Sequence, residues 1–313
     1  TFAQYDFTDW SAIDIIQVMG QALQIRDGDV TDEDIGLYLY TRDNPDHPTF
    51  LEHHRKHNVK RRKGTKVVIH GYLENYRATY MNRIREEYLK LGDFNVIQVD
   101  WKRVAKSYYM SAAKNCYLIG GIIGSALVGM KIPASDIHLI GFSLGSHIAA
   151  FTSKKIKRLT TKQIYRISAL DPAGPYYRMP SIEEDDRLNP GDASIVDVIH
   201  SDGGFLGYIL PIGTFDIYAN RGIRRQPGCQ DSEPSLDRRQ FLENVLCSHS
   251  RAHDFYIQSI VMSNLTCRVC ENFDAMDSES CSDDNTITIV NQKVTKDMRG
   301  ICALTTSDSE PYF

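Results

Sequence analysis

The sequence has no hydrophobic run long enough to cross a membrane as a helix. Its most apolar stretch is Tyr117–Met130, which is shorter than the roughly 20 residues that a bilayer requires. We therefore predict a buried helix in this glycine-rich stretch. The mean hydropathy of −0.35 is also too low for a membrane protein. With 42% hydrophobic residues, the chain is at the same time too apolar to be disordered.

The sequence also lacks a large excess of charge of either sign. Lys and Arg number 36 and Asp and Glu number 40, which gives a net charge of −4. Because phosphate binding needs a strong positive excess, this balance excludes nucleic acid as the main partner. One basic run, His53–Lys66, stands out. It has two interpretations: a solvated loop or strand edge, or a patch that attracts anionic lipid headgroups or polyanionic glycans.

Cysteine is almost absent from the first two thirds of the chain, where only Cys116 occurs. The other six lie near the end: Cys229, Cys247, Cys267, Cys270, Cys281 and Cys302. This clustering predicts three disulfides and one buried thiol, and hence an oxidising compartment. No secretory signal is visible in Thr1–Tyr5, so a secreted protein would be in its mature form here. The glycosylation motif at Asn264 fits secretion.

Internal repeats, low-complexity tracts and linkers rich in Pro, Gly or Ser are absent too, which favours a single domain over residues 1–313. Short apolar runs alternate with helical patterns, and continuous apolar runs are typical of strands buried on both faces. This order predicts an α/β sandwich with right-handed crossovers. The predicted strands are Leu37–Thr41, Lys66–His70, Asn95–Val99, Ile137–Gly141, Tyr165–Leu170 and Ile195–His200. The predicted helices are Tyr76–Leu91, Tyr108–Met130 and Leu144–Ile156.

The residues around Ser143 carry the strongest chemical signal. A buried-type strand runs into Gly-Phe-Ser-Leu-Gly, and a helix of small and apolar residues follows at once. This is the context of a nucleophile elbow, a sharp turn that lifts a serine above the sheet edge. Gly141 and Gly145 are needed because side chains there would collide with the neighbouring strand and helix. We predict that Ser143 is a nucleophile at a helix N-terminus; the alternative is an ordinary turn serine.

A nucleophilic serine needs a base, which in turn needs an orienting acid, and this elbow fold orders them Ser, Asp, His. Asp171 ends the next predicted strand and is the candidate acid, with a turn-forming role as the alternative. His249 is the candidate base: a helix-like stretch opens at Cys247, and a disulfide at that cysteine would hold the loop of His249 in position. His253, one helical turn later, competes with it. Two further histidines end predicted strands, and a structural hydrogen-bonding role is favoured for both: His70 and His200.

The same chemistry requires an oxyanion hole, which binds the negative oxygen of the tetrahedral intermediate. One donor is expected to be the N–H of Leu144, the residue after the nucleophile. The second should come from the loop after an early strand. There Gly71 allows close approach of the backbone, and the N–H of Tyr72 is the candidate donor.

These motifs together resemble the pancreatic lipase family, in particular its arthropod members, which include the venom phospholipases A1. The resemblance runs from about Leu37 to Phe313 and implies an α/β-hydrolase fold, with a central mostly parallel sheet and helices on both faces. It also maps nucleophile, acid and base onto Ser143, Asp171 and His249. The motifs that carry it are LYLYTRDNP, VVIHGY, NVIQVDW, HLIGFSLGSH, ALDPAG, VDVIHSDGG and CSHSRAHDFY.

The resemblance further implies a lid over residues 230–246, between Cys229 and Cys247; the alternative is a simple disulfide-stapled loop. Several apolar residues of this segment fall near helical spacing: Leu236, Phe241, Leu242, Val245 and Leu246. An apolar lid face exposed only at a lipid surface would give interfacial activation. The family's C-terminal lipid-binding β-sandwich is not expected, because the sequence stops at Phe313.

The family pattern also gives the cysteines and one acidic region a meaning. It implies Cys229–Cys247 and Cys270–Cys281; Cys267 and Cys302 are additions to it and are therefore paired, while Cys116 stays free. The family's calcium region aligns with residues 184–192. The carbonyls of Glu184 and Arg187 and the side chains of Asn189 and Asp192 would be the ligands. Because Asn189 stands where the family has an aspartate, one carboxylate is left. We expect no required cofactor, and a purely structural role for any calcium.

The expected function is a secreted serine ester hydrolase that acts on lipids, most of all as a phospholipase A1 on the sn-1 acyl ester. The short surface loop after His200 and the short lid go with that activity in the family. A neutral triacylglycerol or diacylglycerol lipase is the close alternative, and a non-catalytic lipid-binding protein like the insect yolk proteins is the distant one. The expected partner is a phospholipid or acylglycerol at a lipid–water interface, with peripheral membrane contact. Neither nucleic acid nor a colipase-type protein is expected as a partner.

Overall fold

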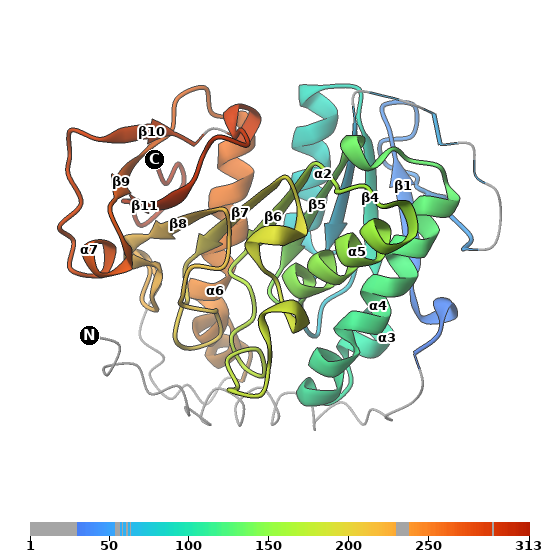
Figure 1. Ribbon diagram of the computed structural model, residues 1–313, viewed down its shortest axis with the longest axis horizontal. Helices are drawn as coiled ribbons and strands as arrows, with labels where there is room; N and C mark the ends of the chain where they lie inside the picture. Colours follow the sequence, from blue (N-terminus) through green and yellow to red (C-terminus); the bar gives the residue numbers. More distant parts are fainter. Residues whose placement is uncertain are drawn as a thin grey trace.

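The computed structural model describes residues 30–53, 57, 59–60, 62, 64–229, 238–289 and 291–313, with the backbone alone for 238–243 and 292. Within these residues, eleven strands form one sheet in the order β10-β9-β11-β8-β7-β6-β5-β3-β4-β1-β2 (Figure 1). The strands are β1 (Gly36–Tyr40), β2 (Thr49–Phe50), β3 (Thr65–Ile69), β4 (Asn95–Asp100), β5 (Ile137–Phe142), β6 (Arg166–Leu170), β7 (Ile195–His200), β8 (Phe215–Ala219), β9 (Thr266–Cys270), β10 (Thr286–Thr288) and β11 (Gly300–Leu304).

The centre of the sheet is parallel and its edges are antiparallel. Strands β4, β3, β5, β6, β7, β8 and β11 run in one direction. Strands β1 and β2 close one edge, and β9 and β10 close the other, all with antiparallel pairing. Because parallel strands end at the same edge of a sheet, the residues after β3, β5, β6 and β7 gather there. That edge carries the predicted site.

Helices cover both faces of the sheet, as the predicted α/β-hydrolase fold requires. Val67 and Ile69 of β3 pack in the core layer under α4 and α5, whereas Val68 between them packs under α2 and α6 (Figure 1). Strands buried on both faces explain why their sequences are continuously apolar. The helices are α2 (Thr79–Leu91), α3 (Lys102–Ala105), α4 (Tyr109–Gly129), α5 (Leu144–Thr160), α6 (Arg238–Val261) and α7 (Phe273–Asp277).

Helix α4 contains the glycine-rich apolar stretch. In the described part of the chain it is the one helix long and apolar enough to span a membrane, and half of its most apolar window is buried inside the protein. Glycines let it approach α5 closely: a Cβ at Gly120 would lie 2.6 Å from the Cβ of Phe151, and one at Gly124 would lie 2.8 Å from the Thr152 carbonyl. Such close packing is that of a core helix, as predicted.

The six predicted strands agree with β1, β3, β4, β5, β6 and β7 to within one residue at each end. Strands β2, β8, β9, β10 and β11 were not predicted from the sequence. Of these, β2 and β10 are two and three residues long and lie at the two edges of the sheet, where sequence alternation is weak, whereas β8, β9 and β11 have five residues each, like β1. The helical stretch expected to open at Cys247 begins earlier, at Arg238, so His249 lies inside α6 and not in a loop. The first part of the predicted lid, residues 230–237, lies outside the described residues, and 238–246 form the start of α6.

Three disulfides join the second half of the chain. They are Cys229–Cys247, Cys267–Cys302 and Cys270–Cys281, the pairs that the sequence analysis arrived at. Cys116 is free and buried in α4. Burial raises the pKa of its thiol to about 12, so it stays protonated and takes no part in the chemistry below.

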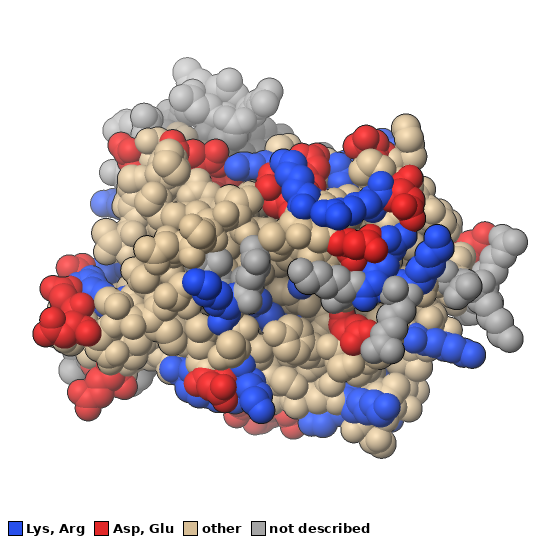
Figure 2. Space-filling view, turned by 90° about the horizontal axis from the view of Figure 1, so that it is seen from above, with Lys and Arg blue, Asp and Glu red and all other residues tan. Residues whose placement is uncertain are grey.

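The basic run at His53–Lys66 is described only in part. Of its described residues, Arg62 pairs with Asp43 and Asp93, and the Nζ of Lys66 lies 3.1 Å from His138 Nδ1. On the face in Figure 2, Lys and Arg lie among Asp and Glu and form no uniform basic field. Both interpretations of the run, a solvated loop or strand edge and a patch that attracts anionic groups, stay predictions.

Candidate active site

Ser143 sits on a sharp turn between β5 and α5. Its backbone is in the left-handed half of conformational space, with φ 55° and ψ −122°, which is strained for a residue with a side chain. A hydrogen bond to the neighbouring strand β6 stabilises this strained conformation: the Ser143 N–H donates to the carbonyl of Leu170 at 3.0 Å. Ser143 is 7% exposed. A strained serine at the carboxyl end of a central strand is the geometry of a nucleophile elbow.

The two glycines around the turn have measurable reasons to be glycine. A Cβ at Gly141 would lie 2.3 Å from the carbonyl oxygen of Gly145 in α5. A Cβ at Gly145 would lie 2.4 Å from the carbonyl oxygen of Ile69, at the end of β3. In both cases the obstacle is backbone, which cannot turn away. The glycines therefore let strand β5, helix α5 and strand β3 meet directly beneath Ser143.

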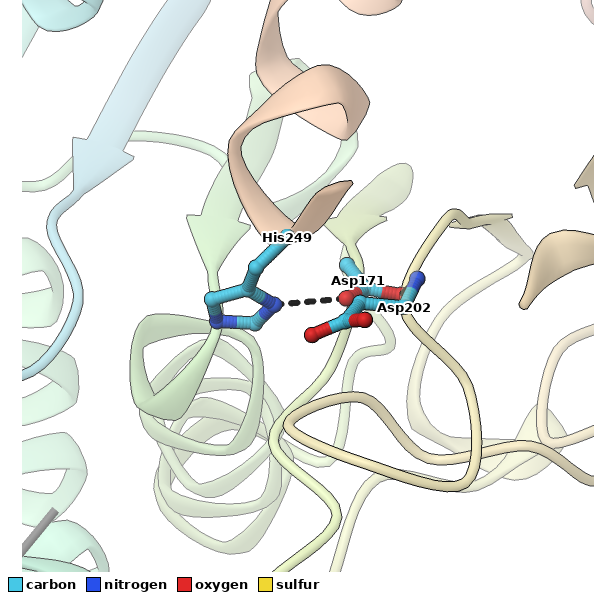
Figure 3. A group of neighbouring side chains, drawn as sticks. All are labelled: Asp171, Asp202 and His249. Carbon is cyan, nitrogen blue, oxygen red and sulfur yellow. Dashed lines mark hydrogen bonds and ion pairs between the residues drawn. The ribbon is translucent and has the colours of Figure 1, made fainter. Parts of the chain in front are cut away.

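Asp171 lies at the end of β6 and is fully buried. Its Oδ1 accepts hydrogen bonds from the backbone N–H groups of Ser201 at 2.8 Å and Asp202 at 3.1 Å. Its Oδ2 lies 2.5 Å from His249 Nδ1 (Figure 3). Gly207 closes over the carboxylate, and a Cβ there would lie 2.5 Å from Oδ1. Asp171 is thus held as an acceptor aimed at one imidazole.

His249 comes from α6, on the opposite side of the site from Asp171 (Figure 3). Its ring packs against that of Phe142, with centroids 4.6 Å apart, so it lies beside the residue that precedes Ser143. His253, the competing candidate, stacks on Tyr80 at 4.3 Å and contacts Asp254 at 3.0 Å. Of these two histidines, His249 is therefore the one whose ring is oriented by a hydrogen bond with Asp171.

The loop after β3 borders the serine, as an oxyanion loop must. A Cβ at Gly71 would lie 3.1 Å from the Cβ of Ser143. The hydroxyl of Tyr72 donates to the carbonyl of Ser107 at 2.7 Å, which fixes the side chain. Within the described residues, neither the Tyr72 N–H nor the Leu144 N–H donates a hydrogen bond. Both groups remain available for a developing oxyanion.

Glu74 supports this loop and was missed by the sequence analysis. Its Oε2 accepts from the Gly71 N–H at 2.7 Å and from the hydroxyl of Tyr80 at 2.8 Å. It lies in the stretch after VVIHGY, but a single half-buried glutamate in a loop gives no periodic signal. Only its contact with Gly71 assigns it a positioning role.

Asp202 is a second buried carboxyl group beside the Asp171–His249 pair (Figure 3). One ligand atom from each of the three side chains lies within 4.8 Å of the others. Neither carboxylate oxygen of Asp202 has a hydrogen-bond partner within the described structure. The motif VDVIHSDGG contains it, yet no role was predicted for it, because the contact joins residues far apart in the sequence.

The grouping of two aspartates and a histidine has the composition of a metal site, but its bonding differs from one. Both oxygens of Asp171 are already occupied by two N–H groups and the imidazole. Burial and the neighbouring Asp171 raise the pKa of Asp202 well above its usual range. A raised pKa makes the Asp202 carboxyl group a poorer source of the anionic oxygen that a metal ion prefers.

Replacing Asp202 with asparagine is expected to remove a pH-dependent cost to stability. Because the pKa is raised in the folded state, the folded protein keeps this proton to a higher pH than the unfolded chain, in which an aspartate titrates near 4. Above about pH 4 and up to the folded pKa, wild type therefore loses up to about 1.4 kcal/mol per pH unit relative to Asp202→Asn. Urea unfolding of both proteins between pH 5 and pH 9 measures this difference; a constant difference would contradict a raised pKa.

The other candidate histidines make structural hydrogen bonds. His70 accepts from the Trp101 N–H at 3.1 Å and stacks on the indole of that residue. His200 lies 2.8 Å from Asp216 Oδ1 and stacks on Tyr218. Neither contacts Asp171 in the described structure. Asn264 is exposed in the turn between α6 and β9, a position open to glycosylation, which stays a prediction.

The predicted calcium region folds as one compact loop on the α5 side of the sheet. The 3₁₀ turns η4 (Glu184–Asp186) and η5 (Pro190–Asp192) make up most of it. Asn189 caps η5 and accepts from the Gly191 N–H at 2.8 Å, and Asp192 Oδ2 accepts from the Asn189 N–H at 2.9 Å. The structure therefore brings the predicted calcium ligands close together, but their polar groups form hydrogen bonds with one another.

Comparison with known proteins gives consistent matches. The profile described as Lipase matches residues 11–312. Similar curated proteins include phospholipase A1 member A of Bos taurus, 35% identical over 225 residues (70% of this chain and 47% of that protein). Pancreatic triacylglycerol lipase of Mus musculus is 32% identical over 243 residues (71% and 51%). Lipase member H of Oryctolagus cuniculus is 31% identical over 249 residues (78% and 53%). The chain spans about half the length of these relatives.

Proposed function

Because this chain belongs to the lipase family, we propose that it is a serine carboxylic-ester hydrolase that acts on lipids. The observation that carries the proposal is the 2.5 Å contact between His249 Nδ1 and the buried Asp171, at the sheet edge where the strained Ser143 stands. A protein that only stores or carries lipid has no use for an oriented acid and base beside a serine on an elbow. An intact set of this kind therefore argues for catalysis.

In the proposed reaction each group has its own step. With Nδ1–H donated to Asp171, the Nε2 of His249 is the basic nitrogen, and it takes the proton as the Ser143 oxygen attacks the ester carbonyl. The N–H groups of Leu144 and Tyr72 stabilise the oxyanion of the tetrahedral intermediate. His249 then protonates the leaving alcohol, which leaves an acyl-serine. Water activated by His249 attacks this acyl group and releases the fatty acid.

Within this class we favour the sn-1 ester of phospholipids as substrate. The segment between β7 and β8 covers only residues 201–214, and short surface loops go with phospholipase A1 activity in the family that the sequence resembles. The relative in Bos taurus that carries the name phospholipase A1 also supports this choice. The name of the Mus musculus relative supports the competing activity on triacylglycerol.

The expected result is that the protein releases fatty acid from phosphatidylcholine vesicles faster than from emulsified triacylglycerol. The rates are measured by titrating the acid released, with Ser143→Ala as the blank in both assays. Position-labelled phosphatidylcholine shows whether the sn-1 chain is the one released. Faster release from triacylglycerol would reverse the order of the two substrates, and equal rates for wild type and Ser143→Ala would overturn the enzyme proposal itself.

We also propose that the protein is secreted and works at a lipid–water interface. Its three disulfides support an oxidising compartment. The disulfide between Cys229 and Cys247 joins the two residues that bracket the proposed lid, residues 230–246, and Cys247 lies in α6, the helix that carries His249. At the end of this segment Val245 is buried and Leu246 packs against the core. The proposed lid therefore ends within one helical turn of His249, the proposed base.

A further inference from the structure

The calcium ligands implied by the family resemblance do not fit calcium in this chain. Calcium takes 6–8 oxygen ligands that point at one centre. Here the Glu184 carbonyl already accepts from the side-chain amide of Asn189 at 3.2 Å, and that amide's own oxygen accepts from Gly191. Asp192 Oδ2 accepts from the Asn189 N–H at 2.9 Å. The amide at position 189 thus acts as a hydrogen-bond donor toward an oxygen that would have to face the metal.

The two remaining ligand oxygens are held by a lysine. The Nζ of Lys154, which comes from α5, donates to the carbonyl of Arg187 at 2.9 Å and to Asp192 Oδ1 at 2.5 Å. The Asp192 side chain is 3% exposed and that of Lys154 is 26% exposed. An ammonium group between these oxygens excludes a divalent cation from the same place, because it fills the space and repels the charge.

We propose that the Lys154 ammonium is the built-in replacement for the family's calcium ion, so that the fold of this loop does not depend on calcium. The charges support the exchange. An ion of charge +2 facing two aspartates is neutral, and an ammonium of charge +1 facing the single carboxylate of Asp192 is neutral too. Asparagine at position 189 and lysine at position 154 therefore form a matched pair, and either substitution alone would leave an unbalanced buried charge.

We call the contacts of Lys154 with Arg187 and Asp192 the lysine clamp. Its position in the fold explains what it stabilises. Helix α5 follows Ser143, and the loop that ends at Asp192 follows Asp171, so Lys154 joins the segments downstream of both residues. Two neighbours on α5 hold the same loop: the hydroxyl of Ser153 donates to the carbonyl of Asp192, and His147 Nδ1 accepts from Leu188 at 3.2 Å. Burial lowers the pKa of His147 to about 3, which keeps its ring neutral and able to accept. The lysine clamp is therefore one of three contacts that attach this loop to α5 without a metal ion.

The first test uses the wild-type protein and does not depend on lipid hydrolysis. Its melting temperature is expected to change by less than about 1 °C between 5 mM EDTA and 5 mM CaCl₂, because a ligand stabilises a protein only if the folded state binds it. Calorimetric titration with CaCl₂ should show no saturable heat. A saturable calcium site, or a clear fall of the melting temperature in EDTA, would overturn the proposal.

The second test removes the lysine. Lys154→Ala should lower the melting temperature by about 5–10 °C, since it leaves the Asp192 carboxylate buried without its partner. The matched control Lys157→Ala removes the same charge from an exposed position of α5 and should shift it by less than about 2 °C.

The double variant Lys154→Ala/Asn189→Asp restores the second carboxylate and removes the ammonium. Its melting temperature should rise with calcium concentration while that of wild type does not. If Lys154→Ala melts like the Lys157→Ala control, the lysine is no clamp and the proposal fails. If the double variant does not fold, the titration of wild type with calcium still decides between the two outcomes.

Discussion

Ser143→Ala and His249→Ala are each expected to lower kcat/KM for lipid ester hydrolysis by about 10⁵–10⁶-fold, and the double variant should be no slower than either. The physical reason is that the serine and the imidazole act as one unit. Without the base, the Ser143 hydroxyl stays protonated and weakly nucleophilic, and without the serine, the base has nothing to activate. Asp171→Asn should cost less, about 10⁴-fold, since it upsets the orientation and tautomer of His249 and leaves the other groups in place.

His253→Ala is the matched control for this set, because it removes the same kind of side chain one turn further along α6. It stacks on Tyr80 and contacts Asp254, so its loss should change kcat/KM by less than about tenfold. Release of fatty acid from phosphatidylcholine vesicles measures all five variants, and thermal unfolding confirms that each is folded. A folded His249→Ala protein with near-normal activity, or a His253→Ala protein as inactive as Ser143→Ala, would exchange the roles of the two histidines.

Gly145→Ala is expected to destabilise the protein by about 3 kcal/mol and to abolish most activity. In a helix without neighbours the same substitution would stabilise, since alanine is the better helix former. Here the added methyl group would lie 2.4 Å from the Ile69 carbonyl oxygen and 2.7 Å from that of His70. Backbone at the end of β3 has to move to relieve this contact, and the oxyanion loop that begins at Gly71 would move with it.

Gly121→Ala provides the opposite case in the same molecule. Gly121 lies in the interior of α4, and a Cβ there would have nothing within 4 Å. It should therefore raise the free energy of unfolding by about 0.5–1 kcal/mol without changing activity. Urea unfolding compares the two variants directly. If Gly145→Ala proved as stable as Gly121→Ala, a methyl group at position 145 would not collide with the backbone at the end of β3, and glycine would not be required there.

The sequence by itself determined the features that have a local pattern. Buried parallel strands are continuously apolar, so β1 and β3–β7 were predicted within a residue at each end. A serine elbow needs glycine two residues before and after the nucleophile, so Ser143, Gly141 and Gly145 could be identified together. The order of acid and base along the chain, with the family motifs around them, singled out Asp171 and His249 as candidates. These patterns can be recognised in the sequence because each depends on residues a few positions apart.

Only the tertiary structure decided the contacts between distant segments. Asp171 and His249 are 78 residues apart, and Lys154 and Asp192 are 38 apart. No periodicity marks such a pair, because the distance between two side chains depends on how the sheet edge and α6 or α5 are packed. The same holds for Asp202 beside the acid, for Glu74 beneath Gly71 and for the early start of α6. Asp202 and Glu74 are polar side chains whose roles depend on the residues that the fold places next to them.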